Sequence, residues 1–291
     1  MSTIETVVYI EDSSNGQPVW IENQNSLFWI EHNNQRLYQY HEPSGEISHC
    51  TLDSPILSLS PSIQNGFIAT LKDGIGFFDM ESRKVIYISK PEPFMSDFES
   101  TGGIADREGN YWATTSSPSD AKQQSHVYQL TPNLSIDRFS HEGVESAAEP
   151  AFSKDGNILY QSTKNGRYVY ATQLDEKRRP VQTDVFCRIL KSEGQPHGLC
   201  VDSEDNLWVC HLGGGCISCY DKTGKRLEKI SINAANVMHC TFGGKDLDTL
   251  FIATNGTGYD EKLTTRKKNM AGCILSTKPG VVGLKTNCFS G

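Results

Sequence analysis

The sequence has no long apolar run, no basic N-terminal leader and no excess of positive charge. No segment approaches the ~18 consecutive apolar residues that a membrane-spanning helix requires. The first residues carry an early acid, Glu5, and lack a basic stretch followed by an apolar run, so no signal peptide is predicted. A formal net charge of −8 disfavours nucleic-acid binding, which needs a basic face. We therefore expect a cytoplasmic protein that binds neither membranes nor nucleic acid.

The sequence also lacks the common local signatures of enzymes and metal sites. It contains no phosphate-cradling glycine loop, no GxSxG and no HExxH motif. It has 9 cysteines, an odd number with irregular spacing, and without an export signal we expect reduced thiols, most of them in core positions. Cys216 and Cys219 form a CxxC, but a strand would point them to opposite faces of a sheet. Structural zinc is therefore not predicted.

A strand-and-turn pattern recurs six times between Val19 and Val282. Each copy has a short apolar strand, a turn rich in Asn, Asp and Gly, and a second strand containing an apolar or aromatic pair. No segment longer than about ten residues shows helical periodicity. The pairs recur at intervals of roughly 40 to 50 residues, the length of one propeller blade. They are Phe28-Trp29, Phe67-Ile68, Tyr111-Trp112, Leu159-Tyr160, Leu207-Trp208 and Leu250-Phe251.

This pattern predicts an all-β fold, a six-bladed β-propeller of four-stranded blades, forming a single domain over residues 1–291. The ring must close, because open end blades would expose strand edges. The run Val7-Val8-Tyr9-Ile10 precedes the first repeat without a partner, so we expect it to form the outer strand of the sixth blade, beside Ala271–Ser276. Two β-sandwich domains are the competing interpretation, but no Pro/Gly/Ser-rich linker lies near the middle.

Several stretches resemble the senescence-marker-protein/gluconolactonase/luciferin-regenerating-enzyme (regucalcin-like) family. PHGLCVDSEDNLWVCHLGGGCISCYDKTGKRL is similar to its fifth blade, and CTFGGKDLDTLFIATNG and AGCILSTKPGVVGLKTNCFSG to its last blade and tail. NGQPVWIENQNSLFWIE and ADREGNYWATT resemble its first and third blades, so the resemblance covers essentially the whole chain. It implies hydrolysis of sugar or related lactones, with one hard divalent cation held by oxygen ligands on the propeller axis.

The positions that match the family's ligands carry different residues. The first-blade Glu falls on Gly16, the third-blade Asn-Asp pair on Thr101 and Gly102, the fourth-blade Asn on Ala148, the fifth-blade Asp on His197, and the substrate-gripping Arg on Glu99. Because Gly16 and Ala148 offer no side-chain ligand, the resemblance predicts a degenerate metal site, with no bound calcium and no other cofactor.

Two histidines are predicted as the catalytic residues. The resemblance places His197 and His239 at the axial ends of neighbouring inner strands, where histidine suits proton transfer near neutrality. Both also suit a softer divalent metal. The alternative interpretation is that each is a hydrogen-bonded histidine filling the space of the lost cation. His211 lies within a strand and is expected to pack in the core, and a Cys-His pair formed by Cys200 or Cys240 is a weaker hypothesis.

Candidate substrate-binding residues surround the same opening. Glu149 adjoins the lost Asn position, Glu99 and Glu145 are expected in loops at the rim, and Thr101 occupies a former ligand position. A carboxylate beside a histidine fixes its tautomer for acid–base work. We therefore expect a small-molecule ligand in the axial funnel and an enzyme of lactone/ester-hydrolase or related acid–base type. A non-catalytic binder of the same family is the alternative, and a protein-binding scaffold is a third interpretation.

Overall fold

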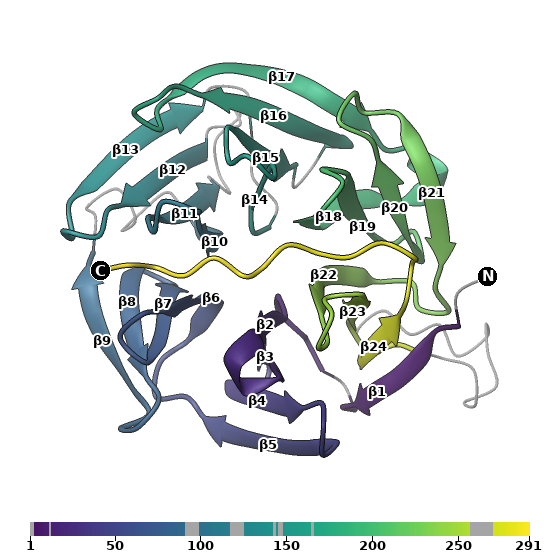
Figure 1. The fold of residues 1–291 in the computed structure, drawn as a ribbon, viewed down its shortest axis with the longest axis horizontal. Helices are drawn as coiled ribbons and strands as arrows, with labels where there is room; N and C mark the ends of the chain where they lie inside the picture. Colours follow the sequence, from purple (N-terminus) through teal and green to yellow (C-terminus); the bar gives the residue numbers. More distant parts are fainter. Residues whose placement is uncertain are drawn as a thin grey trace.

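Six sheets stand around one axis. The computed structural model describes residues 3–11, 13–90, 99–116, 125–141, 144, 148–163, 166–256 and 270–291, except for the side chains of Glu99, Ser140 and His141. In this part of the chain every sheet is four-stranded and antiparallel, and the sheets are arranged as the blades of a propeller (Figure 1). The predicted six-bladed all-β fold is confirmed. No helix that is long and apolar enough to cross a membrane occurs among these residues.

Five of the six blades in the described part of the chain are formed by consecutive strands, and the strand named first for each blade lies nearest the axis (Figure 1). Blade one comprises β2 Val19–Ile21, β3 Ser26–Glu31, β4 Arg36–His41 and β5 Glu46–Thr51. Blade two comprises β6 Ile56–Ser62, β7 Gly66–Leu71, β8 Gly74–Asp79 and β9 Lys84–Ser89. Blade three comprises β10 Glu99–Ala105, β11 Tyr111–Ser116, β12 Ser125–Leu130 and β13 Ile136–His141. Blade four comprises β14 Ala151–Phe152, β15 Ile158–Ser162, β16 Tyr168–Leu174 and β17 Pro180–Arg188. Blade five comprises β18 Gln195–Val201, β19 Leu207–Leu212, β20 Cys216–Tyr220 and β21 Arg226–Ser231. Blade six comprises β22 Val237–Gly243, β23 Thr249–Thr254, β24 Cys273–Thr277 and β1 Glu5–Tyr9. Single 3-10 turns, η1 Glu22–Gln24 and η3 Lys191–Glu193, precede β3 and β18.

The N-terminal strand closes the ring, as the sequence predicts. β1 pairs antiparallel with β24, with Val8 opposite Ile274 and Tyr9 opposite Cys273. The strand is shifted slightly from the expected 7–10, and Ile10 follows it, donating its N–H to the Gly272 carbonyl at 3.0 Å. Val8 is buried in a cluster with aromatic side chains of the first and sixth blades, which include Trp20, Trp29 and Phe251. The joint between first and last blade therefore depends on a segment from the opposite end of the chain.

The six predicted anchor pairs all lie in the second strand of a blade, and all are buried. Each predicted turn before them contains one residue at positive φ, a conformation that Gly, Asn and Asp adopt most readily. These residues are Asn25, Asn65, Gly109, Gly156, Asp205 and Gly244. The turn chemistry and the apolar pairs thus specify where each first hairpin forms.

Blades three and five each contain a buried aspartate that organises the first hairpin of the blade. Asp202 Oδ1 accepts the backbone N–H groups of Glu204 and Asn206, each at 2.9 Å, and its Oδ2 accepts Trp208 Nε1 at 2.9 Å. Asp106 makes the equivalent bonds in blade three, including one from Trp112 Nε1 at 2.8 Å. A buried charge is tolerated when its oxygens accept several hydrogen bonds. Each aspartate therefore ties a turn to the indole of its anchor pair.

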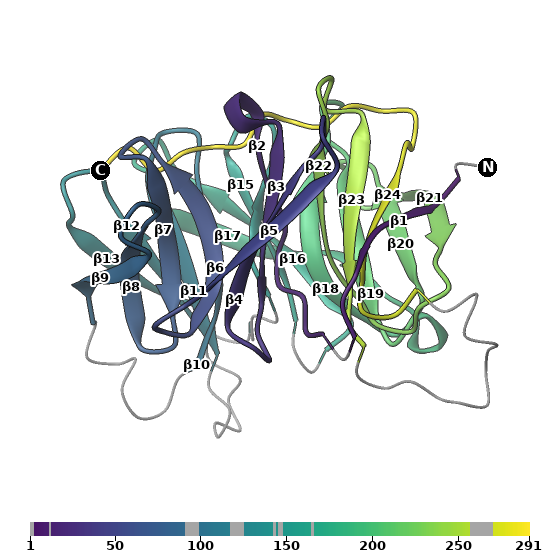
Figure 2. The same cartoon turned by 90° about the horizontal axis from the view of Figure 1, so that it is seen from below.

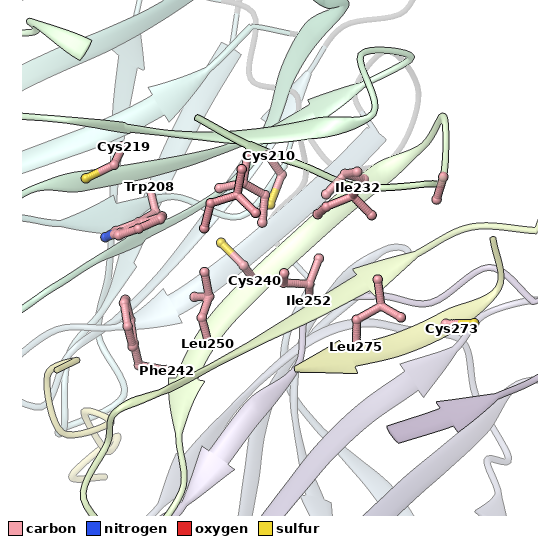
Figure 3. Packing of buried hydrophobic residues seen from close by; sticks show 14 residues of the cluster. Trp208, Cys210, Cys219, Ile232, Cys240, Phe242, Leu250, Ile252, Cys273 and Leu275 are labelled. Carbon is pink, nitrogen blue, oxygen red and sulfur yellow. The ribbon is translucent and has the colours of Figure 1, made fainter. Parts of the chain in front are cut away.

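The interface between blades five and six contains most of the buried thiols. Trp208, Cys210, Cys219, Cys240, Phe242 and Cys273 belong to one cluster of buried apolar side chains (Figure 3). The expectation of core-filling thiols holds for six of the cysteines, while Cys50 and Cys200 are partly exposed and Cys288 is exposed. His211 is fully buried, as expected, and its Nδ1 lies 2.8 Å from the Glu193 carbonyl oxygen.

The C-terminal tail crosses one end of the axis. Figure 1 shows it in yellow running over the centre of the ring, and Figure 2 shows that it lies on one face. Its end is tied to the far side of the ring, where Phe289 N donates to the Pro61 carbonyl at 2.8 Å and Ser290 N to the Gly109 carbonyl at 3.0 Å. The tail therefore covers the axial opening at this face.

A charge on the buried face of β1 should open the ring. Val8→Asp is expected to lower the free energy of unfolding by about 3 kcal/mol or more, because it buries a carboxylate without a partner. Tyr9→Asp is the matched control, since Tyr9 is 61% exposed on the opposite face of the same strand and should lose less than about 1 kcal/mol. Urea denaturation of both variants measures the difference. Equal losses would contradict the role assigned to Val8.

Candidate functional site

A cavity of about 260 Å³ opens at the end of the axis opposite the tail, and we call it the histidine cavity. Its lining comes from the beginnings of inner strands, the segments that lead into them and the residues that follow the second strands β3 and β23. The lining residues are Ser14, Asn15, His32, Leu57, Ser100, Thr101, Glu149, His197, Met238, His239 and Asn255. Both histidines predicted as catalytic therefore converge on one cavity, together with two of the predicted substrate-binding residues, Thr101 and Glu149.

Glu149 and His239 make a close contact in a buried part of the cavity. Glu149 Oε2 lies 2.9 Å from His239 Nδ1, and both side chains are less than a tenth exposed. The contact has the length of an ion pair but not the alignment of a hydrogen bond. Burial acts to raise the pKa of Glu149, but the neighbouring His239, a backbone hydrogen bond and the nearby His197 together hold that pKa below its ordinary value. Glu149 is therefore a carboxylate at neutral pH, aimed at an imidazole.

His197 stands against the same imidazole. The two rings lie 4.9 Å apart between centroids and nearly perpendicular, at 80°. His197 Nδ1 is 3.0 Å from the Met238 carbonyl oxygen. Burial and the adjacent His239 lower the pKa of His197 to about 4, so the ring is neutral near pH 7. A neutral ring that meets a carbonyl through Nδ1 carries its proton there, which leaves Nε2 as a hydrogen-bond acceptor.

A third histidine, His32, also lines the cavity, and the sequence analysis did not identify it. Its Nε2 lies 2.6 Å from the point that a Cβ on Gly16 would occupy. Burial lowers the pKa of His32, an effect that Glu149 partly offsets. The imidazole thus fills the space that a side chain at position 16 would need. The sequence signal for this arrangement was weak: it consisted of Gly16 and of His32 in the following hairpin.

A polar wall of asparagines was also missed. Asn15 N donates to Asn255 Oδ1 at 2.9 Å, and Asn15 Nδ2 donates to the Thr254 carbonyl at 3.0 Å. These bonds join the first and sixth blades at the rim of the cavity. Asn15 Oδ1 is buried and has no hydrogen-bond partner among the described residues. It is therefore an unused acceptor beside the cavity, and buried polar atoms are rarely left unpaired.

The remaining candidates have different positions. Thr101 lines the cavity, but its hydroxyl is 2.8 Å from that of Thr114, so part of its bonding capacity is used inside blade three. Glu145 and the Glu99 side chain lie outside the described residues. Cys200 and Cys240 do not face the histidines: their Sγ atoms are 3.3 Å apart, and burial raises the pKa of Cys200 well above its ordinary value. No Cys-His pair forms in this part of the chain.

Comparison with known proteins relates the whole ring to one family. The family model described as the SMP-30/gluconolactonase/LRE-like region matches residues 16–256. Regucalcin of Bos taurus is 25% identical over 94% of this chain and 94% of its own. The solved structure of the calcium-binding protein regucalcin from Agrobacterium tumefaciens superposes with a TM-score of 0.88 at 16% identity, covering 99% and 97% of the two chains. A gluconolactonase from Xanthomonas campestris gives 0.77 at 19% identity, covering 95% and 89%.

The residues at the positions matched to that family's ligands do not fit a hard cation. Calcium requires six to eight oxygen ligands. Gly16 and Ala148 have no side-chain oxygen, and His197 presents a nitrogen. A ligand side chain at position 16 would also overlap His32 Nε2, so it would require that imidazole to move. Among the described residues, no group of three or more His, Cys, Asp or Glu side chains is placed to hold a metal ion.

Calorimetric titration with Ca²⁺ tests this disagreement. We expect no one-site isotherm in the micromolar range, because Gly16, Ala148 and His197 offer no side-chain oxygen at the positions matched to the family's ligands. The same titration with Mg²⁺ serves as a second hard cation, and elemental analysis of the purified protein reports any softer metal on His197 and His239. A micromolar isotherm that disappears in Thr101→Ala or Glu149→Gln would overturn the prediction.

His197 should make folding stability depend on pH. With a folded pKa of about 4 against 6.5 unfolded, only the unfolded chain binds this proton between those values. The free energy of unfolding should therefore fall as pH drops from 6.5, by up to about 1 kcal/mol per pH unit for this group. His32, whose pKa is also lowered, adds to the same slope.

Urea denaturation between pH 7 and pH 5 measures this slope. In His197→Gln the slope should be shallower, because glutamine does not titrate. His49→Gln, a change on the exposed outer strand β5, should leave the wild-type slope unchanged. Identical slopes in the wild type and His197→Gln would show that the histidine takes up its proton as readily in the folded state.

Proposed function

The chain belongs to the SMP-30/gluconolactonase/LRE-like family, and from that premise we propose that it hydrolyses a small lactone or ester in the histidine cavity. The family supports a lactonase-type scaffold. One observation carries the proposal: Glu149 Oε2 meets His239 Nδ1 at 2.9 Å inside a cavity that reaches solvent. A carboxylate that orients an imidazole is the arrangement used for general acid–base catalysis.

In the proposed reaction His239 acts on water. Contact with Glu149 directs His239 Nδ1 away from the substrate, so the opposite ring nitrogen, Nε2, takes a proton from a water molecule. The oxygen of that water attacks the ester carbonyl, while Glu149 stabilises the imidazolium that forms. The proton then passes from His239 Nε2 to the departing alkoxide as the carbonyl–oxygen bond breaks. The products are a carboxylic acid and an alcohol, joined in one molecule when the substrate is a lactone.

His197 is proposed to position the substrate rather than to move the proton. Its pKa of about 4 makes it a poor base at neutral pH, but its Nε2 accepts a hydrogen bond from a hydroxyl group. Asn15 Oδ1, which has no hydrogen-bond partner in the described part of the chain, is a second acceptor. Two such acceptors favour a substrate that carries hydroxyl groups. Because the donor set does not fit a hard cation, the proposed chemistry needs none.

Binding without turnover is the second candidate function. The observation that favours it is the same neutrality of His197, together with His32, which fills the space beside Gly16. In this case the cavity keeps its acceptors for a hydroxylated ligand, while the Glu149–His239 pair balances a buried charge and takes no proton from water.

Turnover of a panel of lactones and esters, in the presence of EDTA, tests the proposal. His239→Gln and Glu149→Gln are each expected to lower kcat by ~10²-fold or more, because they remove the base or its orienting carboxylate. His197→Gln should raise KM more than it lowers kcat. His49→Gln, the same change on an outer strand, should keep wild-type rates. Turnover that survives both His239→Gln and Glu149→Gln would overturn the mechanism, and ligand binding with no hydrolysis would favour the second function.

A further inference from the structure

A second cavity, of about 330 Å³, lies on the same axis beneath the C-terminal tail, and we call it the tail cavity. The inner strands line both cavities with different parts of their length. β18 gives His197 to the histidine cavity and Leu199 and Val201 to the tail cavity, and β22 likewise divides His239 from Phe242. The tail forms the remaining wall through residues 284–287 (Figures 1 and 2). This cavity is separate from the proposed hydrolytic site.

The charged residues of the tail cavity are all cationic. Arg107, Lys154 and Lys285 line it, and no Asp or Glu does. Arg107 has a carboxylate nearby, since Glu108 Oε1 lies 3.7 Å from its Nε. Lys154 Nζ donates to the Ser203 carbonyl at 2.8 Å and keeps further donors. Lys285 is exposed on the tail and makes no ion pair within the described residues. The chain itself has a net charge of −8, so three cations with no acid in one lining is a local exception.

The rest of the lining combines apolar side chains with polar ones, which include Ser60, Ser153, Thr241, Thr286 and Asn287. Leu59, Ile104, Phe152, Leu199 and Phe242 supply a hydrocarbon surface. Gln17 adds one polar atom, an Oε1 that is buried without a hydrogen-bond partner among the described residues. Ligand cavities usually combine an apolar wall with a few polar groups that fix orientation. Here the polar groups would select for a negative charge on an otherwise apolar molecule.

We propose that the tail cavity binds a small amphipathic anion, a carboxylate on a short hydrocarbon chain or ring. The carboxylate lies toward Lys285 and Lys154, and the hydrocarbon lies along Phe152 and Phe242. A hydrocarbon of medium chain length fits within the volume of the cavity and covers its apolar side chains. The tail, which crosses the opening, encloses the ligand.

Calorimetric titration with octanoate tests the site. The wild-type protein should bind one octanoate per chain, while octanol lacks the charge and acetate lacks the hydrocarbon, so both should bind at least tenfold more weakly. Lys285→Glu should weaken octanoate binding by about tenfold, because it reverses the charge at the opening. Lys222→Glu, in an exposed turn of blade five, makes the same change of net charge and should bind as the wild type does.

A second pair of variants decides which cavity is occupied. Lys154→Gln should also weaken octanoate binding, whereas Glu149→Gln, in the histidine cavity, should not. The site would be overturned by absence of octanoate binding at millimolar concentration, by equal affinities of Lys285→Glu and Lys222→Glu, or by binding that changes only in Glu149→Gln. None of these measurements depends on hydrolytic activity, so the proposed function and this site can fail separately.

Discussion

Closure of the ring is the constraint on which the rest of the structure depends. β1 and β24 come from opposite ends of the chain, and their pairing completes the one blade, among the described residues, that is not formed by consecutive strands. Without β1, β24 would present an open edge, and Val8 would leave the aromatic cluster between blades one and six. Asn15 and Asn255 meet across the same joint. Closure therefore holds the ring together and also places the polar wall of the histidine cavity.

A closed ring of short inner strands produces two cavities with different chemistry. Each inner strand runs along the axis, so its beginning and its end face opposite openings, and a single strand such as β18 serves both. One opening gathers three histidines and a carboxylate, and the other gathers lysines and apolar side chains beneath the tail. The blades behind the strands are held by bonds, such as those to Asp202, that make no contact with either cavity. Substitutions in the inner strands can therefore change the chemistry while the blades persist.

The sequence predicted the fold better than it predicted the site, for a physical reason. Turn residues such as Asn65 and Asp205 act on their own neighbours, and the apolar pairs report burial locally, so the hairpins can be predicted from short segments. The position of β1 followed from the cost of an open edge. The histidine cavity depends on contacts between blades: His197 and His239 were found through resemblance to a family, and Glu149 through its place beside a lost ligand. His32 was missed because the space it fills is defined by the absence of a side chain at Gly16.

The charge of Glu149 favours release of the product of the proposed hydrolysis. A neutral lactone enters the histidine cavity without facing a like charge, and its ring opening releases a carboxylate beside the buried carboxylate of Glu149. Two like charges at low dielectric repel, so the product is held less tightly than the substrate. At the other end of the axis the signs are reversed, because Lys154 and Lys285 attract the group that Glu149 repels. A neutral ester and an apolar anion would therefore bind at opposite ends of the axis, and neither would need to displace the other.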